Sequence, residues 1–233
     1  MKKPWNWSRS AKIWLGVYLA LLALGLTIFF YPPFGDRVSF DEPSTEEPSF
    51  DELPAIESYE DLQKLVDMDP AEVDNSNLPI TPVDALHTTT PERVDVDMAS
   101  YALVVDGLVN NPLELTYTDI LAYPHTSEVV LLICPGFFAD NAEWTGVLVN
   151  SLLAEAEPMP DAMTVTFYGL DVSLDTYYRQ TLPLETVKQD GVLIAYQVNG
   201  QDLPPEHGYP LRLVVKGSKG FVWVKWLWRI EVS

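Results

Sequence analysis

Basic side chains are scarce in this acidic chain of 233 residues, and several of them gather near the C-terminus. Lys and Arg number 14 against 34 Asp and Glu, which gives a net charge of −20. The gathered residues, interleaved with glycines, are His207, Arg212, Lys216, Lys219 and Lys225. Positive charge beside glycine N–H groups suits a phosphate or another anion. An antiparallel ribbon with basic edge residues explains the same pattern, and both interpretations stay open.

Cys134 is the only cysteine of the chain. A single cysteine excludes an intramolecular disulfide, a CxxC zinc motif and a covalently attached c-type haem. It closes the apolar run 128–133 and precedes Pro135 and Gly136, so we expect its sulfur at the end of a strand. Free cysteine is among the most buried residue types, yet a thiolate is also a soft metal ligand. Buried filler, free thiol and metal ligand all remain open.

The elements that must position these residues are short. The hydrophobic pattern predicts two strands in a hairpin-like unit over residues 101–115, and further strands at residues 128–133, 162–168, 192–198, 211–215 and 221–232. It predicts short helices at residues 118–122, with Thr118 as the cap, and at residues 147–156 and 182–187. Many short strands with few helices indicate an α+β fold built on mixed sheets.

The N-terminal part of the chain has a different composition. Residues 11–31 are apolar over about one bilayer thickness and predict a transmembrane helix. Cationic residues before it place residues 1–10 in the cytoplasm and the rest outside. No small-residue cleavage site follows, so we expect a retained anchor in the lipid bilayer of the cytoplasmic membrane. Residues 32–77, rich in acidic residues and proline, predict an extracytoplasmic linker, in which residues 58–66 have a helical pattern. The domain is expected at 78–233.

Several separate motifs resemble one family. The stretch His207-Gly208-Tyr209-Pro210 with LRLVV, a glycine turn and VKWL is similar to the C-terminal signature of the sulfite-oxidase-type molybdopterin domain. Upstream, DGLV, the cysteine followed by WTGV, and TFYGLD fall in the order of that family. Sulfite oxidases, assimilatory nitrate reductases and periplasmic methionine-sulfoxide reductases share this domain. The resemblance covers residues 78–233 and implies a sulfite-oxidase-type fold.

The resemblance also implies roles for single residues. It makes Cys134 the ligand of molybdenum and Tyr178 an active-site tyrosine near the metal, although a packed aromatic beside Tyr177 is the alternative for Tyr178. Arg212 would engage the phosphate of the molybdopterin cofactor, a task that suits a guanidinium better than an ammonium. The residues that it places against the cofactor are His87, Thr88, Gly169, Asp171, His207, Arg212, Ser218, Gly220, Trp223, Val224 and Lys225.

The function that the resemblance implies is oxygen-atom transfer by a membrane-anchored, extracytoplasmic molybdopterin oxidoreductase. A small oxo donor or acceptor would be its substrate. We expect neither haem nor an iron–sulfur cluster, because the chain lacks their ligands. Electrons would therefore pass to or from a separate cytochrome or quinone-linked membrane protein. The chain stops without the immunoglobulin-like domain of sulfite oxidases, so we expect a monomer.

Two observations bear on partners and on an alternative function. Nucleic acid is disfavoured by the charge of −20. Unlike sulfite oxidases, the chain has no basic residue in the segment 135–141 after the cysteine, which disfavours a dianion such as sulfite. The alternative function is a non-catalytic extracytoplasmic binding or assembly module that kept the fold and lost the metal. The retained Cys134, His207, Arg212 and Lys225 argue against that alternative.

Overall fold

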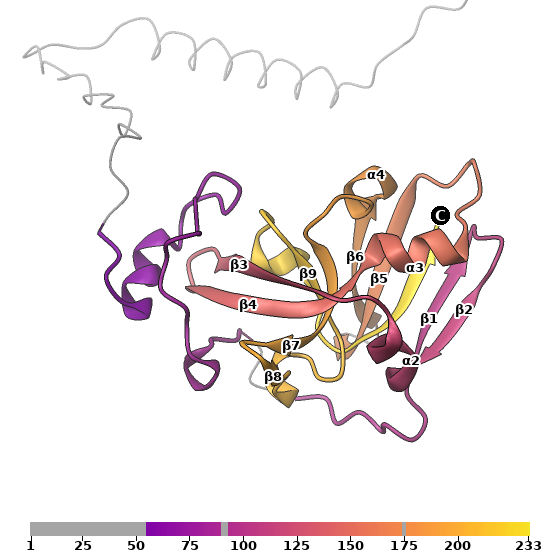
Figure 1. The fold of residues 1–233 in the computed structure, drawn as a ribbon, viewed down its shortest axis with the longest axis horizontal. Coiled ribbons are helices and arrows are strands. Elements are labelled where there is room, and N and C mark those ends of the chain that lie inside the picture. The colour runs from indigo at the N-terminus through magenta and orange to yellow at the C-terminus, as the bar shows by residue number, and fades with distance from the viewer. Residues whose placement is uncertain (1–54, 90–92, 174–175) are drawn as a thin grey trace, which may run out of the picture. The chain divides into compact units, whose positions relative to one another are not determined.

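The structure of the protein is a computed structural model, and it describes residues 55–89, 93–173 and 176–233. Two five-stranded β-sheets form the framework of these residues (Figure 1). The first sheet has the order β2-β1-β10-β5-β6, in which β1 and β10 are parallel and the other pairs are antiparallel. Its strands are β1 (Ala102–Gly107), β2 (Leu113–Thr116), β5 (Thr164–Ser173), β6 (Thr176–Pro183) and β10 (Leu227–Val232).

The second sheet is antiparallel throughout. Its order is β3-β4-β7-β8, and β9 also pairs with β7. The strands are β3 (Thr126–Cys134), β4 (Phe138–Leu148), β7 (Val192–Val198), β8 (Gln201–Asp202) and β9 (Arg212–Val215). Short helices connect the strands: α2 (Tyr117–Ala122), α3 (Val149–Ala156), α4 (Leu184–Val187), and the 3₁₀ turns η3 (Pro205–His207) and η4 (Gly220–Val222). Two further 3₁₀ turns, η1 (Tyr59–Leu65) and η2 (Val83–Ala85), precede the first strand. The predicted α+β fold with mixed sheets is confirmed.

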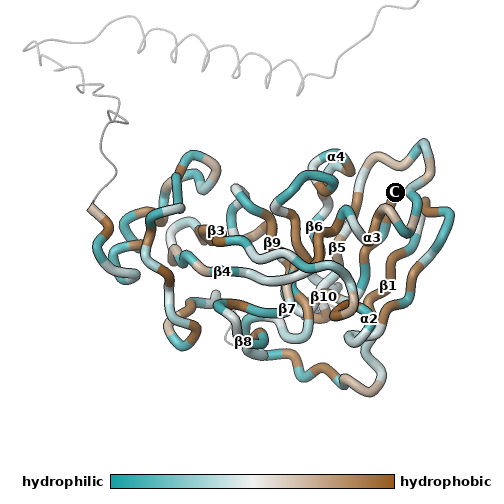
Figure 2. Tube along the Cα trace, viewed as in Figure 1, coloured by the Kyte–Doolittle hydropathy of each residue, from teal (hydrophilic) through white to brown (hydrophobic). Residues whose placement is uncertain are grey.

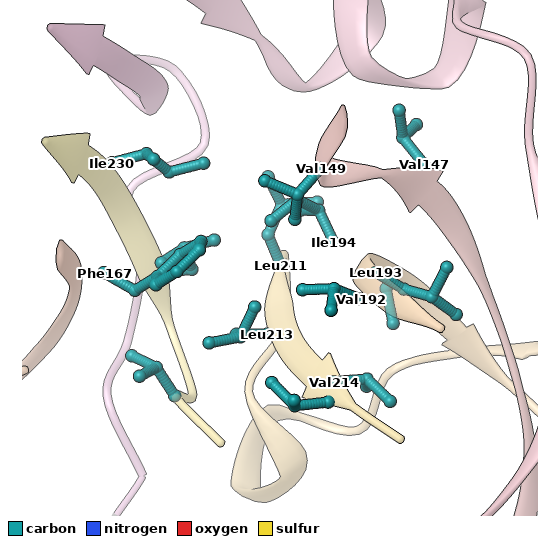
Figure 3. Packing of buried hydrophobic residues seen from close by; sticks show 14 of the residues in the cluster. Val147, Val149, Phe167, Val192, Leu193, Ile194, Leu211, Leu213, Val214 and Ile230 are labelled. Atoms are coloured by element: carbon teal, nitrogen blue, oxygen red, sulfur yellow. The ribbon is translucent and has the colours of Figure 1, made fainter. Parts of the chain in front are cut away.

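The main core lies between the two sheets. Apolar side chains of β7 and β9, among them Ile194 and Leu213, face Phe167 and Ile230 of the first sheet (Figure 3). Figure 2 colours each residue by its hydropathy, and brown apolar stretches run along strands in the middle of the described fold. Each fully buried side chain of this size contributes about 1.5–3 kcal/mol. The core therefore fixes both sheets rigidly enough to hold side chains projecting from their ends.

The β3–β4 hairpin brings Cys134 to the end of its sheet, as the sequence predicts. The Phe137 N–H donates to the Cys134 carbonyl at 2.9 Å, and Gly136 has a φ of +74°, which glycine adopts without strain. Cys134 and Phe138 face each other as the last pair of the hairpin. The strand β4 itself was not predicted, because the polar run after the turn hides its alternation.

Part of the predicted linker is folded against this hairpin. Leu62 and Leu65 of η1 are fully buried in a small second core with Leu131, Ile133 and Ala139. Figure 1 shows this indigo segment beside the ends of β3 and β4. The amphipathic pattern at residues 58–66 was therefore correct, and the expected boundary at residue 78 lies too late in the chain.

Several predicted boundaries were also wrong. The helix after β2 begins at Tyr117 rather than at residue 118, because the Thr116 hydroxyl accepts from the Asp119 N–H at 3.3 Å while Asp119 bonds back to Thr116. The next two helices begin later than expected, at Val149 and Leu184, because β4 and β6 continue up to them. The last strand starts at Leu227 rather than at residue 221, since η4 and a positive φ at Trp226 interrupt it.

The described ranges contain no helix that is long and apolar enough to span a membrane. The transmembrane helix predicted at residues 11–31 lies outside these ranges.

Candidate functional site

A cavity of about 210 Å³ lies where the ends of the two sheets meet. Cys134 and Arg212 reach it from the second sheet, and Asp171 and Tyr178 reach it from the first. The full lining is His87, Thr88, Thr89, Leu132, Cys134, Phe138, Asp171, Tyr178, Arg212, Gly220, Phe221, Trp223 and Lys225. The only thiol of the chain and two cations thus face one space.

Arg212 is a buried cation at the back of this cavity. Its guanidinium carbon lies 5.0 Å from the ring centroid of Trp144 and 5.2 Å from that of Trp223. One amino group donates to the His207 carbonyl at 3.1 Å, while the buried Nε has no hydrogen-bond partner. Burial lowers the pKa of Arg212 to about 10, so it remains a cation at neutral pH. The charge of the buried Asp140 carboxylate raises this pKa in part, but Arg212 forms no ion pair among the described residues. A buried cation without a paired anion is costly, so this group suits an anionic ligand.

Lys225 supplies a second positive charge. Its ammonium donates to the Thr88 hydroxyl at 3.0 Å and to the Glu206 carbonyl at 3.1 Å, and it lies 4.4 Å from the Trp226 ring centroid. Burial and the neighbouring Arg212 lower the pKa of Lys225 to about 8. The group is a cation at neutral pH but holds its proton less firmly than an exposed lysine.

His207 stands behind these cations and is buried. Burial, followed by the charge of Arg212, lowers the pKa of His207 to about 4, so the ring is neutral. Its backbone carbonyl rather than its ring contacts Arg212. The next residue, Gly208, has a φ of +107°, and a side chain there would lie 3.1 Å from the Lys225 Cα. This glycine therefore allows the loop to approach Lys225 closely.

Cys134 is partly buried, and burial raises the pKa of its thiol. Gly220 packs directly against it, since a Cβ at position 220 would lie 3.5 Å from the Cys134 Cβ. Because burial raises its pKa, the thiol is protonated at neutral pH.

Tyr178 and Asp171 approach from the opposite sheet. The Tyr178 hydroxyl donates to the Phe221 carbonyl and accepts from Gln180 Nε2 at 2.9 Å. Asp171 Oδ1 is buried with no hydrogen-bond partner, and burial raises the pKa of this carboxyl group. Burial and the Asp171 carboxylate also raise the pKa of Tyr178, so the phenol stays neutral.

Most of the residues predicted for the site do meet here. Those that line the cavity are His87, Thr88, Cys134, Asp171, Tyr178, Arg212, Gly220, Trp223 and Lys225. Gly169 lies behind Asp171, His207 backs Arg212, and Val224 is buried in the core. Ser218 is not in the lining; its carbonyl accepts from the Trp223 indole at 3.3 Å.

Other residues of the site were not predicted. Thr89, Leu132, Phe138 and Phe221 also line the cavity. Trp144 was noted only as part of a motif, and nothing local in the sequence shows that its ring contacts Arg212. Asp140 pairs with His87, which lies 53 residues earlier, and nothing local in the sequence shows this contact.

The site and the fold agree with one family. The profile of the oxidoreductase molybdopterin-binding domain family matches residues 87–233. The chain belongs to this family, which confirms the resemblance seen in its motifs. Its predicted cofactor class, molybdopterin, is that of the family.

Individual relatives show the same relationship. NADPH nitrate reductases of Fusarium oxysporum and Aspergillus niger are 30% and 31% identical to the chain over 169 residues, covering 63% of it. The chain spans only 19% and 20% of their lengths. The crystal structure of the sulfane dehydrogenase SoxCD from Paracoccus pantotrophus matches with a TM-score of 0.61 and 26% identity, over 88% of this chain and 58% of that one.

The residues present fit a molybdopterin cofactor. Within the described ranges neither Arg212 nor Lys225 forms an ion pair, and the Arg212 Nε lacks any partner. A phosphate would supply the missing acceptors, and a thiol is the donor that suits a soft metal. Both kinds of group face the same cavity.

Proposed function

We propose that this chain is a molybdenum-dependent oxidoreductase in which Cys134 ligates the metal and Arg212 with Lys225 holds the cofactor phosphate. One observation carries the proposal: two cations without an ion-pair partner among the described residues line the same cavity as the only thiol of the chain. When bound, the cofactor would supply two-electron oxygen-atom transfer, while the protein supplies binding and orientation.

Each side chain around the cavity would have its own role in binding. Arg212, packed against the rings of Trp144 and Trp223, would pair its guanidinium with the phosphate. Thr88 holds the Lys225 ammonium in place and links the segment before β1 to the cofactor. Tyr178, a neutral phenol anchored by the Phe221 carbonyl, would orient a bound substrate. Leu132 and Phe138 keep water from the metal side of the cavity.

The substrate that fits best is a neutral organic oxo donor or acceptor. Exposed aromatic side chains lie in or next to the cavity lining: Phe221, a lining residue, is 57% exposed, and Phe137, the chain neighbour of the lining residue Phe138, is 74% exposed. The segment after Cys134 adds no cation for a second anion. Apolar contacts would hold an organic substituent here, while a dianion would find little charge stabilisation.

The setting of the enzyme is part of the proposal. Residues 11–31 would anchor it in the cytoplasmic membrane with the catalytic domain outside, and a separate cytochrome or quinone-linked membrane protein would exchange electrons with it. The absence of haem and iron–sulfur clusters from this chain stays a prediction. SoxCD and the nitrate reductases are oxidoreductases by name, which supports a redox partner for this domain too.

Metal analysis tests this function. The full-length protein, purified in detergent from its own host, should contain molybdenum near one per chain and release a fluorescent pterin after acid oxidation. Cys134→Ser should lose most of the metal, whereas Ser218→Ala, a substitution outside the cavity lining, should retain it. A well-folded wild-type protein without molybdenum or pterin contradicts the enzyme and favours the binding or assembly module.

A further inference from the structure

His87 is held at three points by two residues of β4. Its backbone N–H donates to Asp140 Oδ2 at 2.8 Å, and its ring Nδ1 lies 2.9 Å from Asp140 Oδ1. The ring also stacks on Phe138, with centroids 5.4 Å apart and an angle of 18° between the planes. Asp140 and Phe138 are two positions apart on one strand and therefore project from the same face. This arrangement fixes both the position and the rotation of the imidazole.

The aspartate in this pair is buried and the histidine is accessible. The Asp140 side chain is 1% exposed, and that of His87 is 48% exposed and lines the cavity. A carboxylate can only accept a hydrogen bond, so the His87 Nδ1 must carry the proton. The opposite ring nitrogen, Nε2, is then the atom left to take or give a proton. Phe138, on which the ring lies, is the strand partner of Cys134.

We infer that His87 is the proton-transfer residue of this cavity and that Asp140 is its positioning residue. The inference rests on the proposed oxygen-atom transfer. Reduction of an oxo substrate consumes two protons and two electrons and yields the reduced substrate and one water. The electrons come from the external redox protein, and His87 Nε2 delivers the protons one at a time, regaining each from solvent. In the opposite direction it accepts them. Asp140 offsets the charge of the imidazolium that forms.

Other groups near the cavity are less suited to this exchange. Arg212 and Lys225 are engaged as cations, His207 is buried and has no place in the lining, and the Tyr178 hydroxyl donates its proton to a backbone carbonyl. One carboxylate oxygen of Asp171, Oδ1, is buried and has no hydrogen-bond partner with which to exchange a proton. His87 combines a cavity position with solvent access. The resemblance made it a cofactor contact, whereas its pairing with Asp140 fits proton transfer.

The positioning half of the inference is tested without the cofactor. The chain has three histidines, so ¹⁵N spectra of the labelled protein resolve each ring. In its neutral form His87 should show a protonated Nδ1 and a bare Nε2, and His125, an exposed histidine outside the cavity, is the reference ring. Asp140→Asn keeps the side-chain shape and removes the charge, and should let His87 populate both neutral tautomers. A wild-type His87 protonated at Nε2 would overturn the inference.

The catalytic half is tested by chemical rescue in the metal-loaded enzyme. With methyl p-tolyl sulfoxide and trimethylamine N-oxide as probes and reduced benzyl viologen as the electron donor, His87→Ala should lower kcat about 100-fold, within the usual range for a lost acid–base group. Molybdenum content should stay unchanged. Added imidazole should restore at least about 10-fold, because it can enter the vacated volume and transfer protons. Asp140→Asn should lower kcat about 10-fold with KM unchanged.

The outcomes separate the two proposals. If the wild-type protein holds no molybdenum, or reduces neither probe, the proposed function is contradicted, and with it the reaction in which His87 would transfer protons. If the wild-type enzyme is active, two results overturn the inference alone: His87→Ala is as active as wild type, or His87→Ala is impaired and imidazole does not restore it. His125→Ala, which changes an exposed histidine outside the cavity, is the matched control and should behave as wild type.

Discussion

The Arg212 guanidinium lies over the Trp144 indole, with 5.0 Å between its central carbon and the ring centroid. The aromatic faces stabilise the cation in part, but a ring quadrupole is a weaker partner than a carboxylate. The buried Asp140 carboxylate attracts Arg212 without pairing with it, and the effect of burial on the pKa of Arg212 is the larger of the two, so we expect Arg212 to destabilise the cofactor-free fold. This conflict between stability and binding is expected of a residue selected for a ligand.

Arg212→Met should separate stability from binding. The apolar side chain would pack against the two tryptophan rings, so the cofactor-free protein should gain about 1–3 kcal/mol in its free energy of unfolding. Cofactor content should fall more than 10-fold, because a charge-assisted pair contributes about 1.5–3 kcal/mol. Urea unfolding and pterin release measure the two quantities. Loss of both stability and cofactor would show that Arg212 is structural; Arg229→Met, on the first sheet, is the control for removing an ion-paired arginine.

Lys225 gives the cofactor-free protein a pH signature. Its pKa is lowered from the ordinary 10.5 to about 8 in the fold. Between these values the unfolded chain holds the proton and the folded chain does not, so stability rises with pH in that window and the gain is absent below pH 8. For one partly buried group the gain is about 2 kcal/mol. The free-energy difference between wild type and Lys225→Met should therefore shift by this amount from pH 7.5 to pH 10.5.

The comparison with Lys225→Met removes the other titrations of that range, since the raised pKa values of Cys134 and the tyrosines are common to both proteins. The same deprotonation should weaken retention of an anionic cofactor above pH 8. A difference between the two proteins that stays constant with pH contradicts the lowered pKa. Lys219→Met serves as a control on a lysine of the neighbouring turn.

The sequence was most informative where rare residue types carry the chemistry. One cysteine in the chain and few cations in an acidic composition made Cys134, Arg212 and Lys225 stand out, and all three line the cavity. The strand β4 was hidden because Asp140 and Asn141 are polar yet buried. Their partners lie far away in the chain: the Asn141 N–H bonds the Thr81 hydroxyl, 60 residues earlier. Contacts of this range have no local signal.

Gln63 tests whether the segment before residue 78 is part of the fold. Its amide donates to the Ala139 carbonyl at 2.9 Å and accepts from the Ala139 N–H at 3.1 Å, which completes the free edge of β4. Gln63→Ala leaves both backbone groups without this partner and should cost about 1–3 kcal/mol in the free energy of unfolding. Lys64→Ala, which loses only exposed contacts, should change stability by less than about 0.5 kcal/mol. Equal effects in urea unfolding would mean that η1 is only loosely attached.

Gly169 of β5 tests how closely this strand must approach the segment that leads into β10 at the site. A Cβ at this position would lie 2.4 Å from Asp171 Oδ1 and 2.7 Å from the Lys225 carbonyl oxygen. The backbone oxygen cannot move without shifting β10, so Gly169→Ala should cost about 2–4 kcal/mol and displace Lys225 from the cofactor. Gly220→Ala, in the cavity lining, is a control for stability alone, because its nearest obstacle is the Leu132 Cδ1 at 2.9 Å, the end of a flexible side chain. It should cost about 1 kcal/mol or less. Thermal unfolding measures both variants and molybdenum content measures Gly169→Ala, and a stable, metal-loaded Gly169→Ala would contradict the close approach of β5 to the segment before β10.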